Sequence, residues 1–217
     1  MGLFWRIYLC FIGCLEAINR GYDLWGRLIL AFLSGVGGGT LRDLLIGEDR
    51  LPFYYVKDLT YPLGILIVVL ITSPIVALNQ DSHQSEIFKK TKKYADILGF
   101  TALAITGAAI SISSSLPWFW ALICAALTCA GGGMLRDIVV NQEPSTFKGM
   151  IYEEVAVVGA FCLVIGLMIA NHFEYTPIPV YLSLIFSIIL IICLRLAIYK
   201  YHLRYPKILG GTHSDSH

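Results

Sequence analysis

The sequence predicts an all-α polytopic membrane protein, because of its composition, the length of its apolar segments and a motif that occurs twice. Hydrophobic residues make up 57% of the 217 residues and charged residues only 14%, and the mean hydropathy is +0.71. A soluble domain carries about 25% charged residues. The apolar segments recur at about 20 residues, the length at which a helix crosses a bilayer. The formal net charge of +1 gives no reason to expect a nucleic-acid partner.

The repeated motif is Gly-Gly-Gly-x-x-Arg-Asp, at residues 37–43 and again 94 positions later at residues 131–137. In a helix interior each glycine destabilises by about 1 kcal/mol relative to alanine. An arginine or aspartate at membrane depth costs roughly 3 kcal/mol on the insertion scale. A membrane protein that carries both destabilising features twice is expected to need them for its function.

Seven apolar segments are predicted as membrane-spanning helices, in the order 3–18, 24–46, 59–78, 97–116, 117–140, 155–170 and 178–198. The first is short and contains Arg6 and Glu16. A cleaved signal peptide, with a lipoprotein-like site ending at Cys14, is the alternative. The second half contains a counterpart of this segment, in which Gly107 corresponds to Gly13, and this favours a transmembrane helix.

The chain divides into two similar halves. Each half reads span, glycine-containing span, span, and because three is an odd number the second half enters the membrane in the opposite sense. The halves therefore form an inverted repeat, whose motifs are related by a pseudo-two-fold axis in the membrane plane. The predicted units are a first repeat at 1–79, a basic cytoplasmic loop at 80–94, a second repeat at 95–171, a seventh helix at 172–199 and a cytoplasmic tail at 200–217.

The orientation follows from lysine and arginine, which gather on the cytoplasmic side of membrane proteins. The central loop ends in Lys89, Lys90, Lys92 and Lys93. If this loop is cytoplasmic, most of the other basic residues outside the two motifs are cytoplasmic as well. The prediction is an N-terminus outside and a C-terminus in the cytoplasm.

The consecutive glycines have two interpretations. Small residues let helices approach closely, as the pair Gly35 and Gly39 at GxxxG spacing would. That explains one or two glycines, whereas three in a row, twice, favour a helix that is broken. In the first copy Thr40 would cap the second half-helix and Asp43 would be its third residue, a capping-box pattern. Met134 stands at the cap position of the second copy. We predict that the second and fifth helices are broken at their glycines, with a kink as the alternative for the fifth.

No pattern of an enzyme, a cofactor site or a metal site is visible in the sequence. A phosphate-binding loop needs a preceding strand and a following Lys-Ser/Thr, and both are missing at the glycines. Neither H-E-x-x-H nor G-x-S-x-G occurs, and the Arg-Asp pairs have no nucleophile beside them. Glu16 is expected to pair with Arg20, four residues later on the same helix, rather than to carry protons.

The duplicated G-G-G-x-x-R-D motif, three spans per copy, a basic central loop and a seventh helix together resemble the prokaryotic branch of the trimeric intracellular cation (TRIC) channels. The repeat of this family has also been labelled a glycine transporter domain. The resemblance implies a homotrimer in a prokaryotic plasma (inner) membrane, with one ion pathway in each subunit and potassium as the main permeant ion. It implies that the second and fifth helices bend and line that pathway. The residues it points to are Gly37, Gly38, Gly39, Arg42, Asp43, Gly131, Gly132, Gly133, Arg136 and Asp137.

A cation pathway raises the question of what neutralises its arginines. A fixed positive charge 4 Å from a potassium ion repels it by about 4 kcal/mol at an effective dielectric constant of 20. Asp43 follows Arg42 directly and points about 100° away around the helix, which makes it a poor partner. We predict that Arg42 and Arg136 are held by acceptors from other segments, namely freed carbonyls, the aspartate of the other copy or a lipid phosphate.

Two transport functions remain open from the sequence, besides a structural or signalling role without transport. The first is a passive channel for monovalent cations, which the resemblance favours. The second is a secondary transporter of a small zwitterion such as glycine, since inverted repeats with broken helices are common in transporters. Membrane lipids are expected partners of either one.

Overall fold

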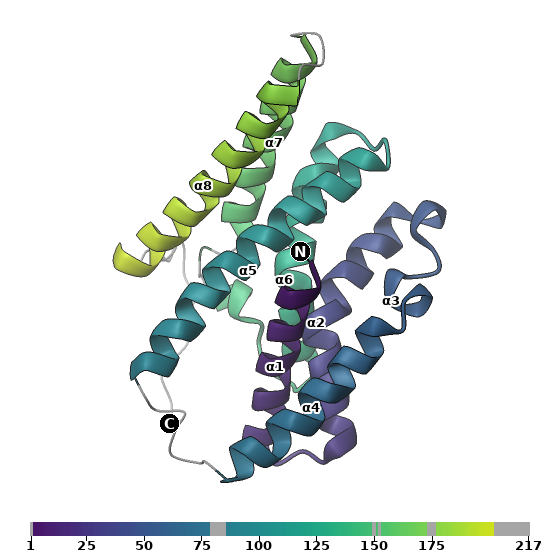
Figure 1. The fold of residues 1–217 in the computed structure, drawn as a ribbon, viewed down its shortest axis with the longest axis vertical. Coiled ribbons are helices and arrows are strands. Elements are labelled where there is room, and N and C mark those ends of the chain that lie inside the picture. The colour runs from purple at the N-terminus through teal and green to yellow at the C-terminus, as the bar shows by residue number, and fades with distance from the viewer. Residues whose placement is uncertain (1, 79–85, 149–150, 152, 173–176, 202–217) are drawn as a thin grey trace, which may run out of the picture.

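The computed structural model describes residues 2–78, 86–148, 151, 153–172 and 177–201, and within them all regular structure is helical. Figure 1 shows the arrangement of the helices. The α-helices are α1 (Gly2–Asn19), α2 (Leu24–Ile46), α3 (Tyr54–Lys57), α4 (Thr60–Leu78), α5 (Glu86–Ser113), α6 (Trp118–Val139), α7 (Glu153–His172) and α8 (Pro177–Tyr201), with short 3₁₀ turns η1 (Glu48–Arg50) and η3 (Ser145–Lys148).

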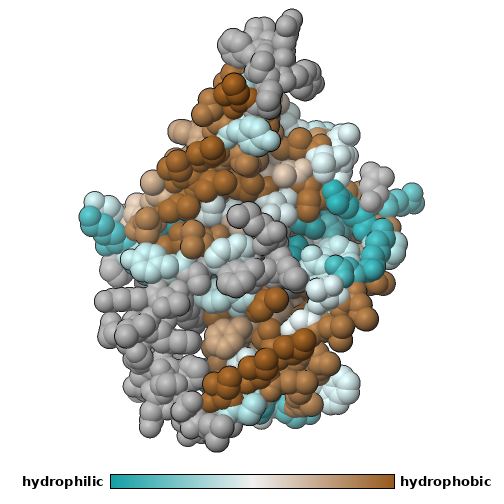
Figure 2. All heavy atoms as spheres, in the orientation of Figure 1, coloured by the Kyte–Doolittle hydropathy of each residue, from teal (hydrophilic) through white to brown (hydrophobic). Residues whose placement is uncertain are grey.

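The protein is a multi-pass membrane protein. Five of the described helices are long and apolar enough to span a bilayer, namely α2, the Asp96–Ser113 part of α5, α6, α7 and α8. The apolar part of α4, Thr60–Val76, is shorter. Figure 2 shows apolar side chains along α8 and α4 and hydrophilic side chains gathered near α3. The number of spans, predicted to be seven, stays a prediction.

The ends of α2 and α6 follow from local sequence. Asp23 caps α2, since its side chain accepts a 2.8 Å hydrogen bond from the Gly26 N–H. Gly47 ends α2 with φ of +87°, and Asn141, 94 positions later, follows α6 with φ of +54°. Glycine and asparagine tolerate this left-handed conformation best, which is why both helices end there.

The two halves of the chain use the same contacts. In the first half α1 packs on α2, and in the second α5 packs on α6. Gly13 of α1 lies against Ser34 of α2, and Gly107 of α5 lies against Thr128 of α6. Each of these residues is related to its counterpart by the offset of 94 positions. Each half also has its own apolar core, one between α1, α2 and α4 and one between α5, α6, α7 and α8.

Helix α8 is fastened to α5 by an ion pair. Arg195 donates to Asp96 Oδ2 at 2.5 Å, and the Tyr199 hydroxyl donates to the same oxygen at 3.0 Å. The Arg195 guanidinium also lies 4.4 Å from the centre of the Phe100 ring. In Figure 1, α7 and α8 run side by side and lie against α5. Helix α5 begins at Glu86, so the basic residues before the apolar span, predicted as a loop, extend that helix.

Candidate functional site

Helices α2 and α6 cross at the middle glycine of each motif. A Cβ on Gly38 would lie 2.6 Å from the Leu127 carbonyl oxygen and 2.7 Å from that of Thr128. A Cβ on Gly132 would lie 2.6 Å from the Ser34 carbonyl oxygen. These spaces are too small for a methyl group. The two backbones are therefore in direct contact, as in the close helix crossings that small residues permit in membranes.

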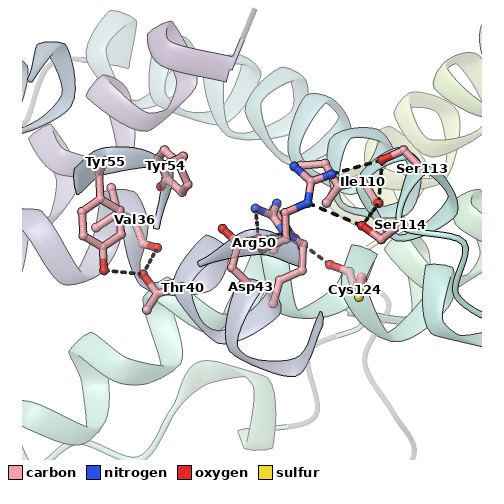
Figure 3. A network of polar contacts seen from close by, with 12 residues as sticks. Val36, Thr40, Asp43, Arg50, Tyr54, Tyr55, Ile110, Ser113, Ser114 and Cys124 are labelled. Atoms are coloured by element: carbon pink, nitrogen blue, oxygen red, sulfur yellow. Dashed lines mark hydrogen bonds and ion pairs between the residues drawn. The ribbon is translucent and has the colours of Figure 1, made fainter. Parts of the chain in front are cut away.

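The prediction that α2 and α6 are broken at their glycines is wrong. Both helices run without interruption through residues 37–39 and 131–133. The Thr40 hydroxyl donates to the Val36 carbonyl oxygen at 2.9 Å, so Thr40 lies inside α2 and does not cap a second half-helix (Figure 3). The carbonyl groups around the glycines therefore remain within continuous helices, and the glycines allow the two helices to pack closely. A bend of either helix stays a prediction.

The first glycines of the two motifs have matching surroundings, and the third glycines do not. A Cβ on Gly37 would lie 3.0 Å from the Leu135 side chain and one on Gly131 would lie 3.0 Å from the Leu41 side chain, which is a reciprocal arrangement. By contrast, the third glycines have different surroundings. A Cβ on Gly39 would lie 3.0 Å from Nη1 of Arg6, whereas a Cβ on Gly133 would meet nothing within 4 Å. The crossing is symmetric at its centre and asymmetric at its edges.

Each motif arginine is paired with the aspartate that follows it. Arg42 donates to Asp43 Oδ1 from Nε at 2.8 Å and from Nη2 at 2.6 Å. Arg136 donates to Asp137 Oδ1 at 2.9 and 2.7 Å from the same two nitrogens. The expectation that the adjacent aspartate is a poor partner is therefore wrong, and the acceptor that Arg42 has on another segment, the Thr128 hydroxyl, is additional to it. The long arginine stem folds back far enough to bring the guanidinium to the neighbouring carboxylate, although the two side chains leave the helix in different directions.

The two pairs differ in their exposure. The side chains of Arg42 and Asp43 are 2% and 3% exposed, and those of Arg136 and Asp137 are 21% and 9% exposed. Arg42 also donates from Nη1 to the Thr128 hydroxyl at 3.5 Å, which links the first pair to the opposite motif helix. A fully enclosed ion pair depends strongly on both partners, because neither charge can turn to water when the other is lost.

Beside the first pair lies a cavity of about 440 Å³, which we call the basic pocket. It is lined by Arg6, Arg42, Asp43, Arg50, Pro52, Tyr54, Lys57, Tyr61, Thr106 and Ile110. These residues come from both halves of the chain, and four of them are cationic. Figure 3 shows Arg50, the last residue of η1, extending to Ser113 and Ser114 at the end of α5. Arg50 donates to Ser113 Oγ at 3.1 Å.

Arg6 forms the buried wall of the basic pocket. Its guanidinium donates to the Tyr54 hydroxyl and, at 3.5 Å, to the Gly35 carbonyl oxygen, and it lies 4.3 Å from the Tyr54 ring centre. Arg6 is only 6% exposed. Burial raises the pKa of Tyr54 above its usual value, so the phenol stays neutral. Among the described residues, the partners of Arg6 are thus uncharged.

Other charged groups form ordinary pairs. Arg20 donates to Glu16 at 2.8 Å, so the predicted pair between them is confirmed. Within the described ranges, no three His, Cys, Asp or Glu side chains come together in a group that could hold a metal ion.

Comparison with known proteins identifies the family to which this chain belongs. The family model described as glycine transporter matches residues 6–77 and 93–168, one match in each half of the chain. The chain belongs to this family. Its curated relatives include the UPF0126 membrane protein YvgT of Bacillus subtilis, 29% identical over 71% of this chain and 72% of the relative. They also include the UPF0126 inner membrane protein YadS of Escherichia coli, 26% identical over 89% and 87%.

Solved structures similar to this member of the glycine transporter family are TRIC channels. One, from a study of the structural basis of conductance through TRIC cation channels, has a TM-score of 0.77 and 26% identity over 97% of both chains. The trimeric intracellular cation channel orthologue of Rhodobacter sphaeroides has a TM-score of 0.75 and 26% identity, over 93% of this chain and 96% of that one. The resemblance to the TRIC family drawn from the sequence is confirmed.

Sequence reasoning identified the motif residues but not their close crossing, and it missed most of the basic pocket of this TRIC-family protein. All ten motif residues lie on α2 and α6, and the first two glycines of each copy face the other motif helix. The pocket residues Arg6, Arg50 and Lys57 were not expected to meet. Arg6 carried a signal, since a lone arginine in an apolar segment faces protein or water rather than lipid. The other two lie in a link whose folding the sequence pattern does not indicate.

Proposed function

We propose that the protein is a homotrimeric channel for monovalent cations, permeable to potassium, with one pathway in each subunit. The observation that carries this proposal is the match to the TRIC cation channel structure over 97% of both chains at a TM-score of 0.77. The relative from Rhodobacter sphaeroides, similar over 93% of this chain, is itself described as trimeric. The exposed apolar surface of α8 is available for contact with lipid or with neighbouring subunits.

The pathway follows α2 and α6. Its proposed residues are Gly37, Gly38, Gly39, Arg42, Asp43, Gly131, Gly132, Gly133, Arg136 and Asp137. One part of it is the basic pocket, and beyond the Arg42–Asp43 pair the contact of Gly38 with Gly132 leaves no room for water. We infer that this conformation is closed and that opening requires α2 and α6 to slide or separate at their crossing. The glycines favour such a movement, because at Gly38 and Gly132 the two backbones meet without side chains between them.

The Arg–Asp pairs shape the pathway without blocking it. A single positive charge at 4 Å would repel potassium by about 4 kcal/mol at an effective dielectric constant of 20, and a paired carboxylate offsets most of that. In both copies the guanidinium and the carboxylate are within 3 Å of one another. Each arginine is thus a structural pin rather than an ion-binding group.

Recording single channels from the purified protein in a planar bilayer tests this function. We expect discrete conductance steps in potassium chloride and a reversal potential that follows the potassium gradient. If discrete steps are absent and reconstituted vesicles accumulate labelled glycine, the protein is a transporter instead. The pocket disfavours that alternative, because the carboxylate that lines it, Asp43, is already engaged by Arg42 and is poorly placed to bind an ammonium group.

The predicted orientation can be tested with introduced cysteines. Glu48 lies at the end of α2 and Gln142 just after α6, and both are exposed. In a background without other cysteines, the Glu48→Cys variant should react with an impermeant thiol reagent in intact cells. The Gln142→Cys variant should react only after the membrane is permeabilised. The reverse pattern would place the N-terminus in the cytoplasm.

A further inference from the structure

We propose that the basic pocket binds a phosphate-type oxyanion, either free phosphate or the headgroup of a phospholipid. The pocket contains four cationic side chains and one carboxylate, a formal excess of three positive charges. Such an excess inside a membrane protein, close to a proposed cation pathway, calls for a counter-charge. The inference that this anion regulates conduction rests on the proposed channel function, whereas the inference of binding does not.

Among the described residues, a carboxylate balances one of the four pocket cations. Asp43 balances Arg42, with both hydrogen bonds ending on its Oδ1. Arg6 is enclosed and has a phenol and a backbone carbonyl as partners. Arg50 donates to serine hydroxyls, and Lys57 is exposed at the rim. Within the described residues, Arg6 and Arg50 thus have uncharged partners, and Lys57 adds a third positive charge to the lining of the same cavity.

The pocket has the donors that an oxyanion needs. Guanidinium groups present planar pairs of N–H donors that match the oxygens of phosphate, and lysine adds a point charge. The side chains of Tyr54 and Tyr61 line the same cavity, as does Thr106, whose hydroxyl donates to the Ala102 carbonyl oxygen at 2.6 Å. The volume of about 440 Å³ accommodates a tetrahedral anion together with water, or a lipid headgroup.

The extra cations do not belong to the scaffold that the two halves share. The positions 94 residues after Arg6, Arg50 and Lys57 hold Phe100, Pro144 and Ile151. Of the four pocket cations, only Arg42 has a cationic counterpart, Arg136. If the three additional charges were needed for the helix crossing, the second half would require equivalents. Their presence on one side alone points to a ligand site added to one mouth of the pathway.

Anion binding would change the electrostatic potential that a cation meets when it enters the pathway. With the pocket empty, its positive charges repel potassium, and with a phosphate bound most of that repulsion is removed. The effect should weaken as salt rises, because the Debye length falls from about 10 Å at 0.1 M to 3 Å at 1 M. Conductance at low ionic strength should therefore increase several-fold on adding phosphate.

Titration calorimetry of the purified wild-type protein in detergent, with inorganic phosphate as the probe, tests the binding. We expect saturable binding of one phosphate per subunit. The double variant Arg50→Gln/Lys57→Gln should bind at least 10-fold more weakly, and both positions tolerate the change because neither side chain is buried. The matched control is Arg27→Gln/Lys200→Gln, which removes the same two residue types away from the pocket and should bind like the wild type.

A lipid source is distinguished by native mass spectrometry after delipidation, with phosphatidylglycerol or phosphatidylcholine added back. Retention of phosphatidylglycerol by the wild type and the control, but not by the pocket variant, supports the proposal with a headgroup as the ligand. Equal binding by the pocket variant and the wild type, or no binding of either probe, overturns it. Loss of all conductance with phosphate binding intact would refute the channel function and leave the anion site standing.

Discussion

Replacing Gly132 with alanine is expected to destabilise the protein by about 3 kcal/mol, the upper end of the usual range for overpacking. The new methyl group would lie 2.6 Å from the Ser34 carbonyl oxygen. Because this oxygen belongs to the backbone of α2, a side-chain rotation cannot relieve the clash and the two helices must move apart. For a chain of this length such a loss corresponds to about 6–12 °C in Tm.

The control for this prediction is the next residue. Gly133→Ala places its methyl group in open space and gains up to about 1 kcal/mol of helix propensity. Thermal unfolding of the two variants in the same detergent should thus show opposite shifts. Equal Tm values would mean that α2 and α6 do not touch at the glycines. Gly38→Ala, which would meet the Leu127 and Thr128 carbonyls, should behave as Gly132→Ala does.

Replacing Asp43 with asparagine should destabilise the protein by about 3–5 kcal/mol, the loss typical of a buried ion pair from which one partner is removed. The Arg42 side chain is 2% exposed, so its charge would remain enclosed without a carboxylate. Asp137→Asn should destabilise less, since the Arg136 side chain is 21% exposed and can reach water. Thermal unfolding of the two single variants measures the difference.

A double variant separates charge from packing in this test. Arg42→Gln/Asp43→Asn removes both charges and should recover much of the stability that Asp43→Asn loses, because no charge is left unpaired. If the double variant is as unstable as the single one, packing or the hydrogen bond of Arg42 to Thr128 explains the loss. Equal effects of Asp43→Asn and Asp137→Asn would show that enclosure of the first pair does not matter.

Much of the helical arrangement was predictable because helix ends have local signals. The predicted second span, 24–46, coincides with α2, where Asp23 caps the start and Gly47 adopts a left-handed conformation. The start of α5 was not predictable from hydropathy, which reports immersion in lipid and not helicity. The residues from Glu86 onward are polar, and still continue the helix outside the apolar span.

The site was predictable in its residues and less so in its geometry. Three glycines in a row suit both a break and a close crossing, and only the position of α6 decides between them. Leu127 and Ser34, whose carbonyls meet the glycines, are contacts between segments far apart in the chain. Burial of the Arg42–Asp43 pair likewise depends on how the helices come together. The sequence alone cannot supply such tertiary contacts.

The ion pair between Arg195 and Asp96 has a mechanical consequence for opening. It ties α8 to α5, and α8 also packs along α7, so these helices are expected to move as one rigid body with the second half of the chain. The first half then forms the second body, which meets the first at the glycine crossing. Opening would separate the backbone contacts at Gly38 and Gly132 and the few side-chain hydrogen bonds between the halves, such as Arg42 to Thr128 and Arg50 to Ser113, without repacking either apolar core.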